Sequence, residues 1–180
     1  MLTIDENPPA FASRAVGILE GRIGLNPING EKSILFYTPD GAEIPGGVQD
    51  KAAKAILENP LLLTIPVRAL VYPRTRRSRL EVIVIDIEEA GDEVSEQKDL
   101  FLIQGFNIGS KARGISQLAI RANKRSKHQF EKFWLSMYGH LREDMKCVYR
   151  TKVLRKGRKL FIIKSDPILP KCRVPEKIFS

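Results

Sequence analysis

Two short stretches, Ile18-Leu19-Glu20-Gly21 and Leu102-Ile103-Gln104-Gly105, are near copies of each other and decide how the rest of the chain is interpreted. Each combines apolar residues with a polar residue and a glycine, which is typical of a strand that bends. A second set of matches lies 80 residues apart: Leu80 with Leu160, Ile83 with Ile163 and Asp86 with Asp166. A repeated pattern at a nearly constant offset indicates duplication, with chance similarity of short apolar strands as the alternative.

The same order of elements is predicted on both sides of residue 90. In the first half we expect strands at 15–25, 33–37 and 42–44, a helix at 49–58, and strands at 61–72 and 80–87. In the second half we expect strands at 100–108 and 115–121, a helix at 129–138, and strands at 145–154 and 160–164. The second helix is predicted from an aromatic stripe that includes Phe133 and Trp134, which we expect to close one end of a barrel.

This order of three strands, a helix and two strands resembles the OB-fold, a five-stranded Greek-key barrel. The resemblance covers residues 14–89 and 99–170 and rests on element order and spacing. It implies an all-β protein with minor α content, built as two tandem five-stranded barrels with one short helix each. Residues 90–98 are then an acidic linker, and 1–13 and 171–180 are tails. The resemblance also implies a ligand face on the second and third strands of each barrel, flanked by the loop between the fourth and fifth strands.

Charge is divided unevenly between the halves. Residues 1–98 contain 11 Lys and Arg against 15 Asp and Glu, a net charge of −4, whereas residues 99–180 contain 19 against 6, a net charge of +13. A positive excess concentrated in one half predicts a polyanionic partner. The alternative is a solvated basic face that only maintains solubility.

The cationic residues cluster in predicted turns and loops. The candidates for nucleic-acid binding in the second half are Lys111, Arg113, Arg121, Lys124, Arg125, Lys127, Arg150, Lys152, Arg155, Lys156, Arg158 and Lys159. The matching turn of the first half contributes Arg74, Arg76, Arg77 and Arg79. Basic hairpin residues also discourage edge-to-edge pairing of strands, and for the first half this structural role competes equally with binding.

Binding that tolerates any base sequence also requires aromatic rings on which bases can stack. Phe106 and Tyr149 are the candidates, with burial in the core as the alternative for each.

Residue patterns for catalysis are missing from the sequence. His128 and His140 are the two histidines, and neither stands in a metal-ligand spacing. Neither a phosphate-loop motif nor a nucleophile elbow occurs, and the acidic residues gather in the linker. We therefore expect a protein that is not an enzyme and that needs no metal or cofactor.

Sequence features also favour a cytoplasmic protein. The N-terminus lacks the pattern of a secretory signal, and no apolar run approaches the ~20 residues that a membrane span requires. Cys147 and Cys172 are interpreted as reduced thiols.

The leading hypothesis is a non-enzymatic protein that binds single-stranded DNA or RNA, mainly through its basic second half. The alternative hypothesis is a protein-interaction or scaffold module of a larger assembly that docks an acidic protein partner.

Overall fold

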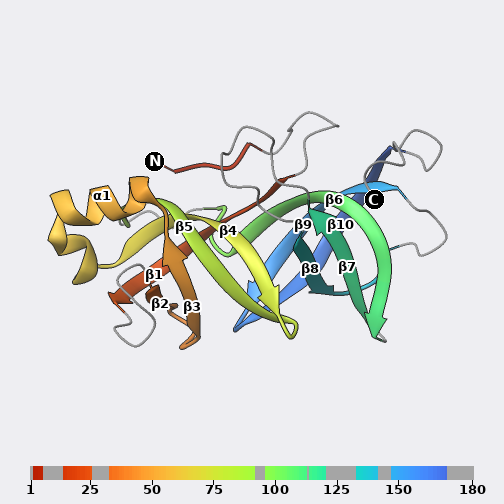
Figure 1. Ribbon diagram of the computed structural model, residues 1–180, viewed down its shortest axis with the longest axis horizontal. Helices are drawn as coiled ribbons and strands as arrows, with labels where there is room; N and C mark the ends of the chain where they lie inside the picture. Colours follow the sequence, from red (N-terminus) through yellow and green to blue (C-terminus); the bar gives the residue numbers. More distant parts are fainter. Residues whose placement is uncertain are drawn as a thin grey trace.

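The structure is a computed structural model of the chain. It describes residues 2–5, 14–25, 33–91, 96–112, 114–120, 133–141 and 147–169, with the backbone alone at 110–112 and 169. The fold is mostly β, as predicted, with one short α-helix among the described residues where two helices were expected (Figure 1).

The first five strands close a barrel. They are β1 (Arg14–Leu25), β2 (Ser33–Tyr37), β3 (Glu43–Val48), β4 (Val67–Arg76) and β5 (Arg79–Glu89). β2 pairs with β1 and β3, β4 pairs with β1 and β5, and a parallel pairing of β3 with β5 completes the ring. Alternate residues along these strands point inward, and Leu19, Phe36 and Val82 lie in the barrel core.

The helix α1 (Asp50–Glu58) lies between β3 and β4, where it is predicted. Its sequence is rich in alanine and lysine, and it ends at Asn59, immediately before Pro60. A 3₁₀-helix, η2 (Pro60–Leu63), then replaces the start of the strand expected at 61–72. Ala52, Ile56 and Leu62 bury one face of these helices against the barrel.

Five further strands lie outside this barrel. They are β6 (Leu100–Ala112), β7 (Ile115–Ile120), β8 (Phe133–Tyr138), β9 (Val148–Lys156) and β10 (Lys159–Leu169). β7 pairs with β6 and β8, and β9 pairs with β6 and β10, which repeats the pairing order of the first barrel. Within the described residues, β8 and β10 meet at a single pair, Tyr138 with Phe161, so a seam between these two strands is almost open.

The expected second helix is wrong at residues 133–138, which form strand β8; residues 129–132 lie outside the described part. Phe133, Leu135 and Met137 face the core in period two and pair with β7. The helical stripe predicted here shares Phe133 and Met137 with this strand pattern, so periodicity over a short apolar run does not distinguish the two. The exposed edge of β7 needs a partner strand, and aromatic residues suit that role.

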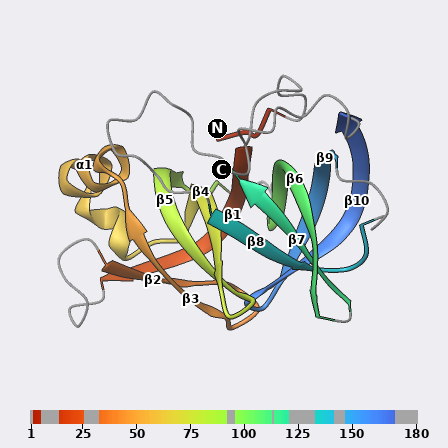
Figure 2. The ribbon, with the colours of Figure 1, turned by 45° about the vertical axis from the view of Figure 1, so that its right-hand side comes forward.

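The two groups of strands share one sheet. β1 and β6 pair antiparallel, with Gly17 opposite Phe101, and this pairing links all ten strands (Figure 2). One hydrophobic core also includes buried residues of both groups. Two separate tandem domains are therefore not confirmed.

A second, smaller core covers the outer face of the β1–β6 junction. Ile4, in the predicted N-terminal tail, is buried there with Ile18 and Leu102. The Ile4 N–H donates to the side chain of Gln97 at 2.8 Å, within the predicted linker. Beside this core, the buried guanidinium of Arg68 contacts the Glu20 carboxylate at 2.8 Å.

The close approach at Gly17 gives the first prediction. A methyl group at Gly17 would lie 2.1 Å from the ring of Phe101, which is fully buried and has no room to move. We expect Gly17→Ala to lower the free energy of unfolding by about 2–3 kcal/mol, as overpacking of a core does. Thermal and urea unfolding measure this loss.

The matched control is Gly91→Ala, because nothing lies within 4 Å of the added methyl group. It should change stability by less than about 0.5 kcal/mol. Phe101→Leu should recover part of the loss in the Gly17→Ala background. Unfolding of Gly17→Ala at the wild-type midpoint would contradict the assigned packing.

Candidate functional site

The two basic turns, predicted to lie on separate domains, meet in space. The tips of the β4–β5 and β9–β10 hairpins lie side by side (Figure 1). The Leu80 N–H donates to the Arg158 carbonyl at 2.8 Å, and the Arg158 guanidinium donates to the Leu80 carbonyl at 3.4 Å. The exposed cations around this contact form one surface, here called the basic crest: Arg76, Arg77, Arg79, Lys156 and Lys159.

The β4–β5 turn holds its side chains at a conformational cost. Arg77 and Ser78 have φ angles of 51° and 62°, in the left-handed region where glycine or asparagine is usual. Such a conformation costs about 1–2 kcal/mol per residue. Gly157, in the other turn, adopts its φ of 57° without this penalty. An arginine kept at a strained tip suggests that its side chain has a role.

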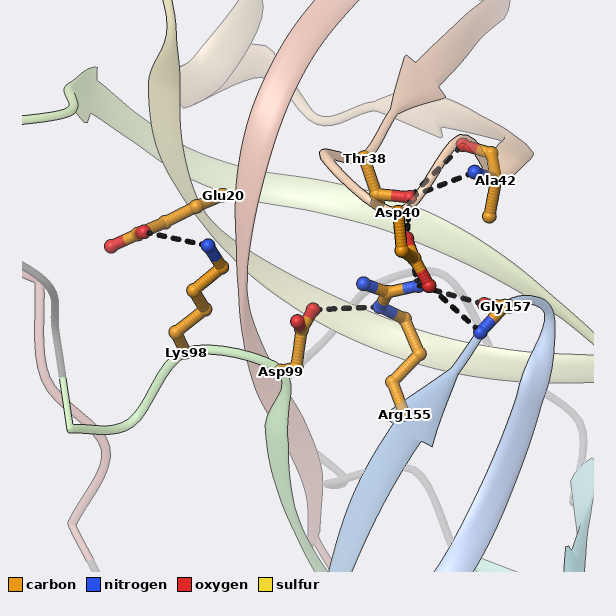
Figure 3. Close-up of polar contacts among 8 residues, drawn as sticks. All are labelled: Glu20, Thr38, Asp40, Ala42, Lys98, Asp99, Arg155 and Gly157. Atoms are coloured by element: carbon orange, nitrogen blue, oxygen red, sulfur yellow. Dashed lines mark hydrogen bonds and ion pairs between the residues drawn. The ribbon is translucent and has the colours of Figure 1, made fainter.

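Arg155 differs from the other predicted binding residues because it is buried. Its Nε donates to Asp99 at 2.6 Å, and its Nη1 donates to both carboxylate oxygens of Asp40 at 3.0 Å (Figure 3). The Gly157 N–H donates to the same Asp40 carboxylate at 3.1 Å. Arg155 therefore joins the β9–β10 hairpin to the β2–β3 turn, and its charge is neutralised by carboxylates instead of facing solvent.

The pKa of Asp40 reflects this arrangement. Partial burial alone would raise it, but hydrogen bonds from Thr38, the Gly157 N–H and Arg155, together with the arginine charge, outweigh burial and lower the pKa from 3.8 to about 2. Asp40 is thus ionised throughout the physiological range and is committed to the contact with Arg155.

A groove of about 390 Å³ opens beside the basic crest, between the β4–β5 hairpin and the outer face of β7 and β8. Its hairpin wall includes Arg74, Arg77 and Glu81, and its floor includes Gln117 and Trp134. Cationic, acidic, amide and aromatic groups thus converge on one concave surface.

Trp134 is the most exposed aromatic side chain among the described residues, with 60% of its surface accessible. The prediction that it plugs a barrel is wrong, because in strand β8 it points away from Leu135 and the core. The residue opposite it on β7 is Ala119, whose methyl group leaves the indole uncovered. Its neighbour Phe133 packs partly into the core, with the Arg74 guanidinium 4.7 Å from its ring centroid.

The other predicted residues are distributed differently. Phe106 and Tyr149, the stacking candidates, are only 6% and 2% exposed, and Tyr149 lies in the hydrophobic core. Neither ring is therefore accessible to a base, which corrects their predicted role. Arg150 donates to Gln104 at 3.2 Å on the outer face of β9, and Lys152 is half-buried there. The side chain of Lys111, and Arg113, Arg121, Lys124, Arg125 and Lys127, lie outside the described residues.

Residues typical of catalytic or metal sites do not converge in the described part of the chain. It contains no group of three or more His, Cys, Asp or Glu that could hold a metal ion. His140 is exposed, and His128 lies outside the described residues. None of the described helices has the length and apolar character to cross a membrane.

The contribution of Asp40 gives the second prediction. Its pKa is lower in the folded protein than in the unfolded chain, so its stabilising effect is complete above about pH 4 and is lost as pH falls toward 2. Asp40→Asn should cost about 1 kcal/mol at pH 7, a discounted value because the side chain is 44% exposed. Urea unfolding between pH 7 and 2.5 measures whether the difference from wild type shrinks.

Asp166→Asn is the control, since that carboxylate is exposed and forms a surface ion pair with Lys164 at 3.4 Å. It should unfold like the wild type at every pH. An Asp40→Asn penalty that stays constant from pH 7 to 2.5 would rule out the assigned ionic contact.

Comparison of the chain with models of known protein families and with curated protein sequences finds no match. Function is therefore inferred from the geometry and chemistry of the basic crest and the groove.

Proposed function

We propose that the protein binds single-stranded nucleic acid, DNA or RNA, without catalysis, at the junction of its two groups of strands. The phosphates contact the basic crest, and an unpaired base stacks on Trp134 in the groove. The observation that carries this proposal is the exposed indole ring beside a cluster of exposed cations. Stacking rings next to a cationic surface are what single-strand binding without sequence readout requires.

Exposure of Trp134 favours single strands over duplexes. In a duplex the faces of the bases are covered by neighbouring base pairs, so an indole ring can stack only on a base that has left the stack. Stacking on an aromatic side chain contributes about 1–3 kcal/mol per base.

Electrostatics of the junction also support an anionic ligand. The basic crest combines cations from both hairpins in one small area, which concentrates positive potential and attracts phosphates. Asp40 and Asp99 lie close by, but Arg155 pairs with both of them. Arg155 and these two carboxylates together carry a net charge of −1, against the five positive charges of the crest.

The resemblance to OB-folds is consistent with this location. We propose that β1–β5 and β6–β10 are two OB-like units that arose by duplication, because their strands pair in the same order. Gln117 on β7 and Trp134 on β8 then lie on the second and third strands of the second unit, the face that binds ligands in OB-folds.

An acidic protein partner is the second candidate function. Tryptophan and arginine are also the residues most enriched at the energetic centres of protein interfaces, and the groove contains both. The two functions differ in salt response: phosphate binding weakens log-linearly with salt, whereas a packed protein interface responds less.

Trp134 is the only tryptophan in the chain, so its fluorescence reports directly on the groove. We predict that single-stranded oligonucleotides quench this emission and that duplex DNA of equal length does so much less. Trp134→Ala should weaken binding at least about tenfold, measured by anisotropy of a labelled oligonucleotide, because a stacked base loses its platform.

Tyr37→Ala is the matched control: it removes an exposed aromatic ring from β2 of the first barrel, and affinity should not change. Trp134→Phe should retain part of the affinity. Wild-type binding by Trp134→Ala, or equal quenching by duplex and single strand, would refute the stacking role.

The basic crest gives a separate prediction. Arg76→Ala combined with Lys156→Ala removes one cation from each hairpin. The slope of log Kd against log salt for a single strand should fall by about 1.4, since each lost phosphate contact contributes about 0.7. The measurement is a salt titration of oligonucleotide binding.

Arg22→Ala combined with Lys54→Ala is the charge-matched control, with one exposed arginine and one exposed lysine removed far from the crest. It should leave the slope close to the wild-type value. If the slope decreases equally in both double variants, net charge alone, and not the crest, drives binding.

A further inference from the structure

Strand β8 has an edge that its own group of strands does not pair. Among the described residues, Tyr138 alone has a strand partner at the seam with β10. The backbone groups of residues 134 and 136 point to the same edge, because alternate residues of a strand form hydrogen bonds to the same side. An unpaired buried edge is costly, so another group must satisfy it.

Thr75, from the β4–β5 hairpin, uses its one hydroxyl to form hydrogen bonds with two backbone groups of this edge. The Ser136 N–H donates to Thr75 Oγ1 at 2.9 Å, and Thr75 Oγ1 donates to the Trp134 carbonyl at 3.3 Å. A hydroxyl can accept and donate at once, and here it replaces one residue of a partner strand. The hairpin of the first barrel thus occupies the seam of the second group of strands.

Residues next to Thr75 and Ser136 form further contacts that line the groove. Ser136 is only 4% exposed, and its hydroxyl accepts a hydrogen bond from the Gln117 amide at 2.9 Å. Arg74, the residue before Thr75, lies over the ring of Phe133, the residue before Trp134. The β4–β5 hairpin thus contacts β8 on both sides of Trp134, at Phe133 through Arg74 and at Ser136 through Thr75.

The position of Thr75 is matched in the second group of strands. Thr75 pairs with Leu80 across its hairpin, and Arg155 pairs with Leu160 in the same way. Each hairpin therefore uses the same position to contact the other group of strands. Arg155 makes ion pairs there, whereas Thr75 makes two neutral hydrogen bonds beside an open groove.

We infer that Thr75 is a positioning residue for Trp134, so that the groove is assembled from both groups of strands and ligand binding is coupled to docking of the β4–β5 hairpin. This inference rests on the proposed function for its ligand, but the placement of Trp134 can be tested without any ligand. Loss of the hydroxyl releases the edge of β8 and lets the indole move.

The test compares Thr75→Val, which keeps the shape and removes both hydrogen bonds, with Thr75→Ser, which keeps the hydroxyl. In the absence of ligand, Thr75→Val should lower the steady-state anisotropy of Trp134 emission and speed amide exchange at Ser136. With an oligothymidylate probe, its Kd should rise about tenfold. Thr75→Ser should keep the Trp134 anisotropy, the Ser136 exchange rate and the Kd close to their wild-type values. Thr64→Val is the control, because the Thr64 hydroxyl donates to the Leu61 carbonyl in η2, away from the groove.

The outcomes separate the two proposals. Unchanged Trp134 anisotropy and Ser136 exchange in Thr75→Val overturn the positioning role, whether or not the probe binds. Failure of the wild type to bind any single strand, together with altered Trp134 anisotropy in Thr75→Val, refutes the proposed function and keeps the positioning role. If Thr75→Val does not fold, exchange at Ser136 in the wild type decides: an amide that exchanges as fast as an exposed one overturns the inference.

Discussion

The backbone pairing of Gly17 with Phe101 is the contact on which the arrangement of the molecule depends. These residues occupy equivalent positions of the repeated segments, since Ile18 matches Leu102 in the sequence. An antiparallel pair that joins two equivalent residues is what a local two-fold axis requires. The side chains break that symmetry: glycine leaves space that the Phe101 ring fills. The register of β1 and β6 in turn sets where every other strand of one group meets the other.

One consequence is that two hairpins, 80 residues apart in the chain, come together. Thr75 and Arg155 occupy matching places in them but use different chemistry. Arg155 is buried between Asp40 and Asp99, so that contact is closed by opposite charges. Thr75 contributes one hydroxyl to the edge of β8, so that contact stays narrow and leaves a groove beside it. The two equivalent hairpin positions therefore differ in outcome: one forms the buried ion pairs of Arg155, and the other leaves the groove beside Thr75.

The positive charge of the chain is likewise divided between two uses. Arg68 and Arg155 are buried against carboxylates and hold strands together. Arg76, Arg77 and Lys156 remain exposed at the hairpin tips. A count of basic residues does not separate these groups, because what distinguishes them is whether a carboxylate from another strand reaches them. Arg155 also offsets one of the two carboxylate charges beside the basic crest, so most of the positive charge of the exposed cations remains available to a ligand.

Patterns local in the sequence were enough to determine most of the secondary structure. The predicted strands at 15–25 and 33–37 and the helix at 49–58 agree with the structure, because strand alternation and helix-stopping residues act within a few residues. The basic turns were also identified, though not their meeting. Strand β8, the burial of Arg155 and the exposure of Trp134 were decided by tertiary structure alone. Each depends on a partner distant in the chain: the edge of β7, the carboxylate of Asp40, and the hairpin that carries Thr75. Period-two phasing of 133–138 was the one available signal for Trp134, and the same residues also fit a helical stripe. Only the pairing of distant strands removes that ambiguity, because the free energy that selects the strand comes from contacts that a local pattern does not contain.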